Sequence, residues 1–505
     1  MLFNSYQFIF LYCPIVLLGF FMIGRINHSY AATWLALSSL FFYGYWNPAY
    51  LALLLASVVG NYIAGLWIAR NLSQHKKIQS KQLLSFALVV NLSLLLYYKY
   101  SKFFVININS LTGADWAVGN IILPLGISFF TFTQIAFLVD TYQGKVKEHN
   151  FIHYLLFVTY FPHLIAGPVL HHRQMMPQFD LPITYRISME NISTGVMFFT
   201  IGLVKKVLLA DSFADYATPI FDATHNGMNP TLIVAWVGAL AYTLQLYFDF
   251  SGYSDMAIGI SKMFGINLPI NFNSPYKACN IIEFWRRWHI TLSTFLRDYL
   301  YIPLGGNRKG SVMRYLNLFI TMLLGGLWHG AGWTFLIWGG LHGLYLCINH
   351  LGQHFYGVVR CRGKYRRFLS ILTTFIAVVF AWVFFRAQNI PSALSLIKGM
   401  LGMNGVSLPL SWVFLEKYTI ALPVNIHFNG LIYGGNVPVS QLNTLLLFMT
   451  SFFVIFGLPN SQVFVGNLES LSRRSRLIIA VASGFLLAIS ILSFNRISEF
   501  LYFQF

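Results

Sequence analysis

Apolar stretches long enough to cross a lipid bilayer recur along the whole 505-residue chain. A membrane-spanning helix needs about 20 mostly apolar residues. Hydrophobic residues make up 57% of this sequence and charged residues only 10%, so too few polar side chains remain to cover a water-soluble globule of this size. The sequence therefore excludes a soluble enzyme with a single anchor and predicts an all-α polytopic membrane protein.

The apolar pattern predicts about 11 to 13 transmembrane or re-entrant helices. We expect them near residues 7–24, 30–47, 50–69, 83–100, 118–139, 151–170, 193–210, 231–248, 315–328, 331–350, 367–385, 441–458 and 477–494. Because we find neither a repeat nor a long polar region, we interpret residues 1–505 as one integral membrane domain. The stretch 405–440, rich in Gly, Pro and Asn, is expected to form a long loop.

The middle third of the chain departs from a plain helical bundle. Segments 122–134, 161–170 and 268–276 place Pro, Gly and polar residues at membrane depth. Backbone that leaves a helix there is tolerated only where it is buried in protein or lines a cavity. These breaks predict a central polar chamber between the flanking apolar helices.

The basic residues lie in short clusters between the apolar stretches. Lys and Arg outnumber Asp and Glu by 33 to 15, but this clustering is typical of topology signals and argues against nucleic-acid binding. Arg25 follows the first span, and Arg70, Lys76, Lys77 and Lys81 follow two further spans. The positive-inside rule then predicts that these residues are cytoplasmic and that the N-terminus is extracytoplasmic.

Residues 281–301 form the densest aromatic and charged region, and they are predicted to form one amphipathic helix at or entering the membrane interface. One face would carry Trp285, Trp288, His289, Leu292, Phe295, Leu296 and Tyr299. The opposite face would carry Glu283, Arg286, Arg287, Thr294, Arg297 and Asp298. Anchoring alone would explain most of these residues, but His289 is the one titratable group on the apolar face.

His329 is the leading candidate for a functional site. It follows an apolar run and is flanked by Gly325, Gly326, Gly330 and Gly332, which leave room for a ligand. An ionisable residue at membrane depth is costly and therefore indicates function, although a backbone carbonyl could also satisfy a structural histidine. We interpret His342 as structural, and we expect Asp249 and Asp255 to form hydrogen bonds in a structural polar core.

Several long strings resemble the membrane-bound O-acyltransferases, in particular the bacterial branch that contains the membrane subunit of alginate O-acetyltransferase. The strings are FPHLIAGPV (161–169), YFDFSGYSDMAIG (247–259), NFNSPY (271–276), EFWRRWHITLSTFLRDYLYIPLGGNRKG (283–310) and LLGGLWHGAGW (323–333). The resemblance extends to about Phe385, so the core of the domain is 118–387 and residues 388–505 are less diagnostic. It implies the fold of this family and a place in the bacterial cytoplasmic (inner) membrane.

The resemblance also implies the chemistry. The catalytic histidine of the family's WHG string corresponds to His329, and the histidine of RRWH, here His289, is a second functional position. Acetyl transfer from a thioester to a hydroxyl needs a base near neutral pKa, which suits His329. His289 could orient the substrate or stabilise the oxyanion. An acetyl-histidine intermediate stays open as a second route.

Acetyl-coenzyme A is the expected donor substrate, and no bound cofactor is expected. The cations nearest to the catalytic strings, Arg286, Arg287, Arg308 and Lys309, are candidates for its phosphates, although they could also be ordinary positive-inside residues. We expect a path for the donor's slender arm from the cytoplasmic side to His329. His350 and His354, like the adjacent pair at 171–172, lack companion ligands at metal spacing, so no metal site is expected.

The implied acceptor is an extracytoplasmic polysaccharide such as an alginate-type exopolysaccharide, cellulose or peptidoglycan. Acetyl would reach it directly or through a separate extracytoplasmic acetyltransferase protein. A transporter or channel is the alternative of a different class, because broken helices around a polar site also bind transported substrates. The broken segments do not recur at matched positions in two halves, which argues against transport, and the ionisable His329 argues against a mere scaffold.

Overall fold

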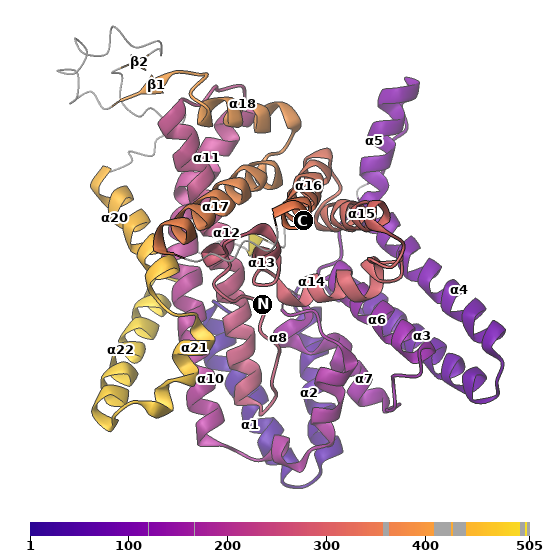
Figure 1. Cartoon of the computed structure of the whole chain (residues 1–505). Helices are drawn as coiled ribbons and strands as arrows, with labels where there is room; N and C mark the ends of the chain where they lie inside the picture. The colour runs from indigo at the N-terminus through magenta and orange to yellow at the C-terminus, as the bar shows by residue number, and fades with distance from the viewer. Residues whose placement is uncertain are drawn as a thin grey trace.

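The computed structural model describes residues 1–119, 121–165, 167–356, 363–408, 426–427, 441–494 and 500–501. Helices follow one another along the described chain (Figure 1). The first group is η1 (Phe8–Tyr12), α1 (Cys13–Gly24), α2 (His28–Gly44), α3 (Pro48–Ser73), α4 (Lys77–Leu95), η2 (Leu96–Tyr100), α5 (Ser101–Thr112), α6 (Ile127–Tyr142), α7 (Phe151–Thr159), α8 (Phe161–Leu164), α9 (His172–Met175), η3 (Met176–Asp180) and η4 (Pro182–Tyr185).

The second group begins at Met189 and ends near the C-terminus. It comprises α10 (Met189–Val204), η5 (Lys205–Ala210), α11 (Asp211–His225), α12 (Leu232–Met263), η6 (Pro275–Lys277), α13 (Ile281–Trp285), α14 (Ile290–Leu296), η7 (Arg297–Tyr301), α15 (Ser311–His329), α16 (Trp333–Tyr356), α17 (Lys364–Arg386), α18 (Ile390–Met400), α20 (Gln441–Phe452), η9 (Phe453–Gly457), α21 (Ser461–Gly466), η10 (Leu468–Ser470) and α22 (Arg473–Leu492). Strands β1 (Val406–Ser407) and β2 (Ile426–His427) pair in parallel. The predicted loop 405–440 lies mostly outside the described residues.

The all-α polytopic class is confirmed. Among the described residues, seven helices are long and apolar enough to cross a membrane, or up to eight if one bent pair counts as a single span. They are Pro48–Ser73, Lys77–Thr112, Met189–His225, Leu232–Met263, Ser311–His329, Lys364–Arg386 and Arg473–Leu492. The segment expected at 118–139 becomes helical only at Ile127, and the segment expected at 151–170 contains the short helices α7 and α8.

The central helix α12 is covered on most sides by other helices. It packs closely on α10 because both helices carry glycine where their backbones meet. A Cβ atom on Gly202 would lie 2.4 Å from the Gly252 carbonyl oxygen, and one on Gly195 would lie 2.5 Å from that of Gly259. Small residues let membrane helices approach in this way. The core around α12 is therefore tightly packed and anchors the elements that form the site.

The predicted breaks in the helical core are present. Residues 113–126, 165–171 and 264–280 contain no α-helix in their described part. Side chains from neighbouring elements supply the missing backbone hydrogen bonds: the Tyr43 hydroxyl donates to the Leu125 carbonyl at 3.0 Å. The irregular backbone at 167–170 is buried, which agrees with the expected chamber, because only protein-covered groups can leave a helix at membrane depth.

The prediction of one continuous helix over 281–301 is wrong. The helix stops after α13, turns, and resumes as α14 at Ile290. His289 stands at the turn with φ 42° and ψ 55°, a left-handed conformation that is uncommon for a residue with a Cβ atom. Tertiary contacts made by His289 override the local helical pattern, and the two short helices meet at this histidine.

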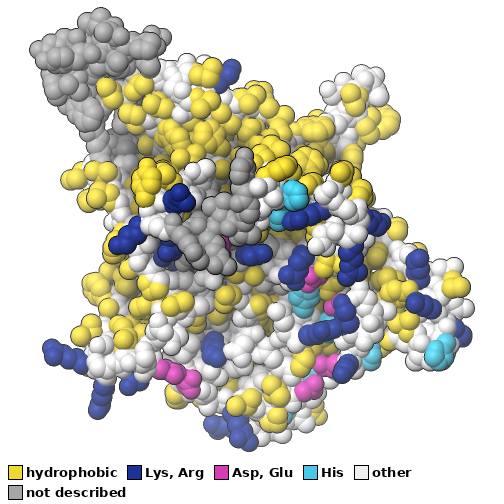
Figure 2. Space-filling view, in the orientation of Figure 1, with side chains coloured by type: hydrophobic (Ala, Val, Ile, Leu, Met, Phe, Trp, Pro, Cys, Tyr) yellow, Lys and Arg dark blue, Asp and Glu magenta, His cyan; other side chains and the backbone are white. Residues whose placement is uncertain are grey.

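The helices α3 and α6 run in the same direction and define two faces of the molecule. Near their starts, the Tyr50 hydroxyl donates to the Ile122 carbonyl at 2.8 Å. Near their ends, Ile68 and Leu138 share an apolar cluster. We call the end that carries Arg70, Lys76, Lys77 and Lys81 the basic face, and the end near Tyr50 the opposite face. Figure 2 shows Lys and Arg side chains mostly in the middle and lower parts of the view, with a mainly hydrophobic upper part.

Candidate active site

His329 is the last residue of α15, at the start of the tight connection to α16. The two helices pack closely through glycines: a Cβ atom on Gly326 would lie 2.3 Å from the Phe335 carbonyl oxygen, and one on Gly339 would lie 2.4 Å from that of Met322. Gly326, one of the glycines flanking His329, and Gly339 of α16 therefore bring the two helix backbones together. This contact fixes the end of α15 that carries the imidazole.

The His329 side chain is surrounded by aromatic rings and borders a small cavity. The residue is 5% exposed, and its ring centroid lies 4.8 Å from that of Trp328, 5.0 Å from Trp338 and 5.2 Å from Phe385. A cavity of about 40 Å³ is lined by Lys99, Leu123, Pro124, Leu125, Gly126, Ile127, Ser128, Phe129, Ile165, Trp328 and His329. The lining residues Leu123 and Pro124 directly follow Ile122, which contacts Tyr50 at the opposite face, so this cavity lies toward that face.

His289, which directly precedes α14, also lies close to Trp328. It is fully buried, and its ring centroid lies 6.5 Å from that of Trp328, which also contacts His329. Trp328 therefore contacts both histidines that the sequence singled out. The structure brings these two residues together although 40 positions separate them in the chain.

The hydrogen bonds of His289 define its tautomer. Its Nδ1 lies 3.0 Å from Asn271 Oδ1, and this oxygen also faces the backbone N–H of Thr291 at 3.4 Å and its hydroxyl at 3.0 Å. A backbone N–H can only donate, so the oxygen is the acceptor and His289 Nδ1 carries the proton. Burial lowers the pKa of His289 to about 3, so the ring is neutral and Nε2 offers a lone pair. An Nε2 lone pair suits the orienting role, whereas the oxyanion role would need an Nε2–H; the role of His289 stays a prediction.

Sequence reasoning missed three residues at this site. Lys99 and Ser128 line the cavity with His329, and Asn271 orients His289. A signal for Lys99 was available, because a lysine within the apolar run 83–100 is an ionisable group at membrane depth. Asn271 had no comparable signal, since its role depends on the turn at His289.

One of the four predicted donor-binding cations lines a large cavity. Arg286 lines a cavity of about 700 Å³ together with Arg297, Arg314 and His350. Arg287 instead forms an ion pair with Glu283, 2.6 Å from Nη2 to Oε1. Arg308 and Lys309 precede the first residue of α15, so about 27 Å of helix separates them from His329 at its far end.

The two larger cavities lie on the side away from the His329 cavity. The 700 Å³ cavity contains Asn307 and Arg314, which flank the start of α15. A second cavity, of about 800 Å³, contains Lys145 and Arg173 and shares Thr294 and Ile302 with the first. His329 lines neither of them. The expected continuous path from the cytoplasmic side to His329 therefore stays a prediction.

Aromatic side chains fill the space between the arginine-lined cavity and His329. Trp285 lines that cavity, and its ring centroid lies 5.9 Å from that of Trp338, which contacts His329. The Trp285 indole N–H donates to His342 Nδ1 at 3.3 Å. His342 thus belongs to the aromatic packing behind the site, as expected for a structural histidine.

Asp249 and Asp255 lie in a buried ion-pair network. Lys205 Nζ is 2.6 Å from Asp255 Oδ2, and Lys206 Nζ is 2.6 Å from Asp249 Oδ1 and 2.9 Å from Asp211 Oδ1. Asp255 also accepts from the Ser461 hydroxyl of α21 at 2.8 Å. The network joins the central helix α12 to η5, α11 and α21.

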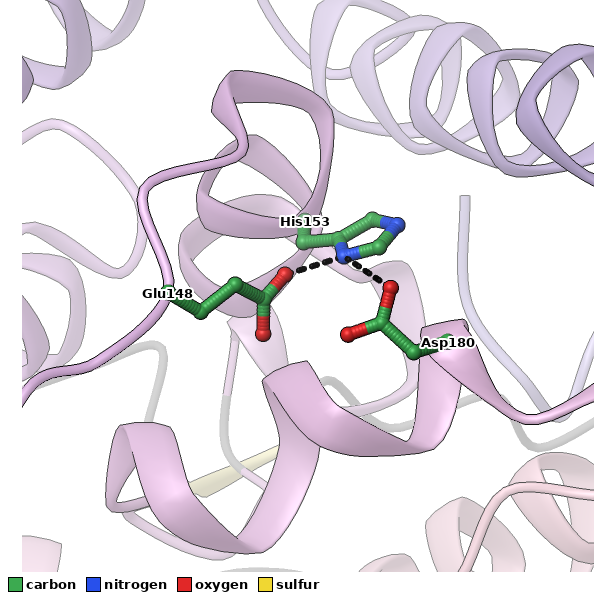
Figure 3. A group of neighbouring side chains, drawn as sticks. All are labelled: Glu148, His153 and Asp180. Atoms are coloured by element: carbon green, nitrogen blue, oxygen red, sulfur yellow. Dashed lines mark hydrogen bonds and ion pairs between the residues drawn. The ribbon is translucent and has the colours of Figure 1, made fainter.

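Within the described residues, one group of three side chains has ligand atoms close enough to hold a metal ion: Glu148, His153 and Asp180 (Figure 3). His153 Nδ1 contacts a Glu148 carboxylate oxygen and lies 3.8 Å from Asp180 Oδ1. Asp180 is largely exposed, and none of the three lines the cavities described above. We interpret the group as a histidine held by carboxylates, and the absence of a metal site stays a prediction.

Comparison with known proteins shows the family of this chain. The model of the membrane-bound O-acyltransferase (MBOAT) family matches residues 40–394. The chain belongs to the membrane-bound O-acyltransferase family. A peptidoglycan O-acetyltransferase of Helicobacter pylori is 41% identical over 534 aligned positions, which cover 100% of this chain and 98% of the relative. A probable alginate O-acetylase, AlgI, of Pseudomonas aeruginosa is 43% identical over 80% of this chain and 75% of its own length. A teichoic acid D-alanyltransferase of Bacillus subtilis is 28% identical over 53% of this chain.

Family membership confirms the predicted fold and enzyme class. The chain is a multi-pass membrane O-acyltransferase, and the transporter or channel alternative is not favoured. The matched residues include both histidines, the cavity next to His329 and the arginine-lined cavity. An acyl donor is therefore implied. The cavity next to His329 and the arginine-lined cavity are the candidate sites for it.

Proposed function

We propose that this membrane-bound O-acyltransferase transfers acetyl from cytoplasmic acetyl-coenzyme A to hydroxyl groups of an extracytoplasmic polysaccharide. The observation that carries this proposal is the meeting of His329 and His289 around Trp328 beside a cavity. Imidazole is suited to move a proton near neutral pH. The acetyltransferase names of the full-length relative and of the alginate relatives support acetyl as the transferred group.

In the proposed reaction, His329 takes the proton of the acceptor hydroxyl as its oxygen attacks the thioester carbonyl carbon. The tetrahedral intermediate then collapses, the C–S bond breaks, and the leaving thiolate takes the proton back from the imidazolium. His289 Nε2 accepts a hydrogen bond and orients the hydroxyl. The second route runs through acetyl-histidine: His329 attacks the thioester carbonyl and the C–S bond breaks to release the thiolate. The acceptor oxygen then displaces the imidazole, and its proton goes to the thiolate.

The two sides of the site suggest separate entrances for donor and acceptor. Arg286 and Arg314 line the cavity near the start of α15, where a polyanionic nucleotide would find cations. The small cavity at His329 lies toward the opposite face. If the basic face is cytoplasmic, the donor enters from the cytoplasm and the acceptor from outside. We propose this orientation, with an extracytoplasmic N-terminus, in the bacterial cytoplasmic membrane.

Cysteine labelling tests the orientation. A cysteine introduced near residue 78, in the loop between α3 and α4, should resist a membrane-impermeant reagent in intact cells and react after the cells are opened. A cysteine introduced at residue 114, after α5, should react in intact cells. The reverse pattern would overturn the proposed topology.

Peptidoglycan is the proposed acceptor. The match to the peptidoglycan O-acetyltransferase covers the whole chain, including the C-terminal helices, whereas the alginate relatives match 77% to 80% of it. An alginate-type exopolysaccharide or cellulose is the second candidate, supported by the similar identity of those relatives. Acetyl reaches the polysaccharide directly or through a separate extracytoplasmic acetyltransferase, which is the proposed partner protein.

The experiment is deletion and complementation in the source bacterium, followed by mass spectrometry of muropeptides and of base-labile acetate on exopolysaccharide. Loss of O-acetyl muropeptides, restored by the wild-type gene but not by His329→Ala, would support the proposal. Loss of acetate from exopolysaccharide alone would favour the second acceptor. Unchanged acetate on both polymers would contradict the proposed function.

A further inference from the structure

Lys99 lies in a π-helical turn, η2, within the long helix formed by α4 and α5. π-Helical turns are rare and are found frequently at functional sites. A lysine at membrane depth is costly unless its ammonium finds partners. The proposed reaction gives Lys99 no role, so its surroundings need a separate explanation.

The Lys99 ammonium is bound to the end of α15. Its Nζ donates to the carbonyl oxygens of Trp328 at 2.5 Å and of His329 at 3.1 Å. The last carbonyls of a helix have no partner inside the helix and form the negative end of its dipole, so a cation is favoured there. Lys99 therefore restrains the backbone of the residue whose side chain we place in catalysis.

The third contact of Lys99 joins this end of α15 to the wall of the cavity. Nζ lies 3.3 Å from the hydroxyl of Ser128, the second residue of α6. Lys99, Ser128 and His329 all line the same cavity of about 40 Å³. Because three donors meet three acceptors, the ammonium holds the parts of the site together and does not serve the substrate as a free donor.

Tyr100, the next residue, provides a natural comparison. Its hydroxyl donates to the Leu327 carbonyl at 2.8 Å, so it binds the same end of α15 one carbonyl earlier. Tyr100 carries no charge, does not contact His329 or Ser128 through a hydrogen bond, and does not line the cavity. If Lys99 and Tyr100 only capped the end of α15, loss of either side chain would have the same effect on activity.

We propose that Lys99 is a positioning residue for acetyl transfer: it holds the His329 turn against the start of α6 and so fixes the imidazole relative to the cavity. This inference rests on the proposed function. A misplacement of about 1 Å can cost roughly 10²-fold in rate. Lys99 does not line the arginine-lined cavity, so its loss leaves donor binding intact.

The test compares purified Lys99→Met, Lys99→Arg and Tyr100→Phe in proteoliposomes supplied with acetyl-coenzyme A and a muropeptide acceptor. Lys99→Met should lower kcat about 100-fold with the donor KM within about threefold of wild type, since only positioning is lost. Lys99→Arg should recover at least a tenth of the wild-type kcat. Tyr100→Phe should lower the melting temperature while its kcat per folded protein stays within about threefold of wild type.

The outcomes separate this inference from the proposed function. Equal kcat values for Lys99→Met and Tyr100→Phe, at matched loss of melting temperature, would show that Lys99 is only structural and overturn the inference. A Lys99→Met variant with a raised donor KM and normal kcat would also overturn it. If wild type and His329→Ala are equally inactive in this assay, both without and with the proposed partner acetyltransferase, the proposed function itself fails.

Discussion

Two polar regions lie deep in this protein, and they are built in opposite ways. Around Asp249 and Asp255, charged side chains pair with Lys205 and Lys206, and the network joins several helices. Around His329, the polar groups are imidazoles and one lysine beside a cavity, enclosed by aromatic rings and glycines. The comparison teaches that burial of a polar group does not by itself mark an active site. Of these two regions only the one around His329 borders a cavity described above, and we therefore propose that the chemistry takes place there.

The largest effect is expected at the imidazole beside the cavity. His329→Ala should lower acetyl transfer by about 10²- to 10⁴-fold, because the transition state loses its base. His342→Ala is the matched control, since it also removes a buried imidazole but one that does not line the cavity. It should keep most of the activity per folded protein. The measurement is the initial rate of acetyl transfer in proteoliposomes, and a normal rate for His329→Ala would contradict the assignment.

The buried ion pairs should affect stability and leave the chemistry unchanged. Asp255→Leu alone removes the carboxylate that pairs with the buried Lys205 ammonium, and it should lower the free energy of unfolding by about 3–5 kcal/mol. Lys205→Met combined with Asp255→Leu removes both charges and should recover much of that loss. Thermal unfolding in detergent measures the effect. If the double variant unfolds like wild type but loses acetyl transfer, the structural interpretation of this network is wrong.

His289 should show a smaller effect on the rate than His329. His289→Ala should lower acetyl transfer by about 10²-fold, the lower end of the effect of a proton-transfer or orienting group. His289→Asn should be the more stable of the two variants, because asparagine tolerates the left-handed backbone at this position. Thermal unfolding compares the two variants.

The pH dependence tests the orienting role of His289. With its pKa at about 3, this ring stays neutral between pH 5 and 9, so His289→Asn should not shift the pH profile in that range. A shifted profile would mean that His289 titrates during the reaction and is more than an orienting group.

The helical class and the breaks in the core could be predicted from the sequence, because apolar runs and proline at membrane depth have local signatures. The sequence also singled out His289 and His329, whose roles stay a prediction. It did not predict the turn at His289, since residues 281–301 fit a helical pattern and Asn271 holds the turn from a distant segment. The sequence also did not predict the hydrogen bond from Lys99 to the His329 carbonyl, because that contact joins residues 230 positions apart. Long-range polar contacts carry no local pattern that a single sequence reveals.

The smallest effect is expected for the arginines, where sequence neighbours lie in different surroundings. Arg286 lines the cavity of about 700 Å³, whereas the neighbouring Arg287 is paired with Glu283 and does not line it. If this cavity holds the phosphates of the donor, Arg286→Ala should raise the donor KM about tenfold, equivalent to about 1.4 kcal/mol, because one charge-assisted hydrogen bond in a solvated cavity is lost.

Arg287→Ala is the matched control, because it removes the same charge one residue away but only breaks a half-exposed ion pair, which contributes little to stability. Its donor KM should stay within about twofold of wild type, and kcat should be normal in both variants since neither arginine lines the His329 cavity. Raising the salt concentration should reduce the difference between wild type and Arg286→Ala, because salt screens exposed charges. Equal KM values for the two variants would show that the donor does not bind in this cavity. The cavity of about 800 Å³ lined by Lys145 and Arg173 would then be the candidate for the donor site.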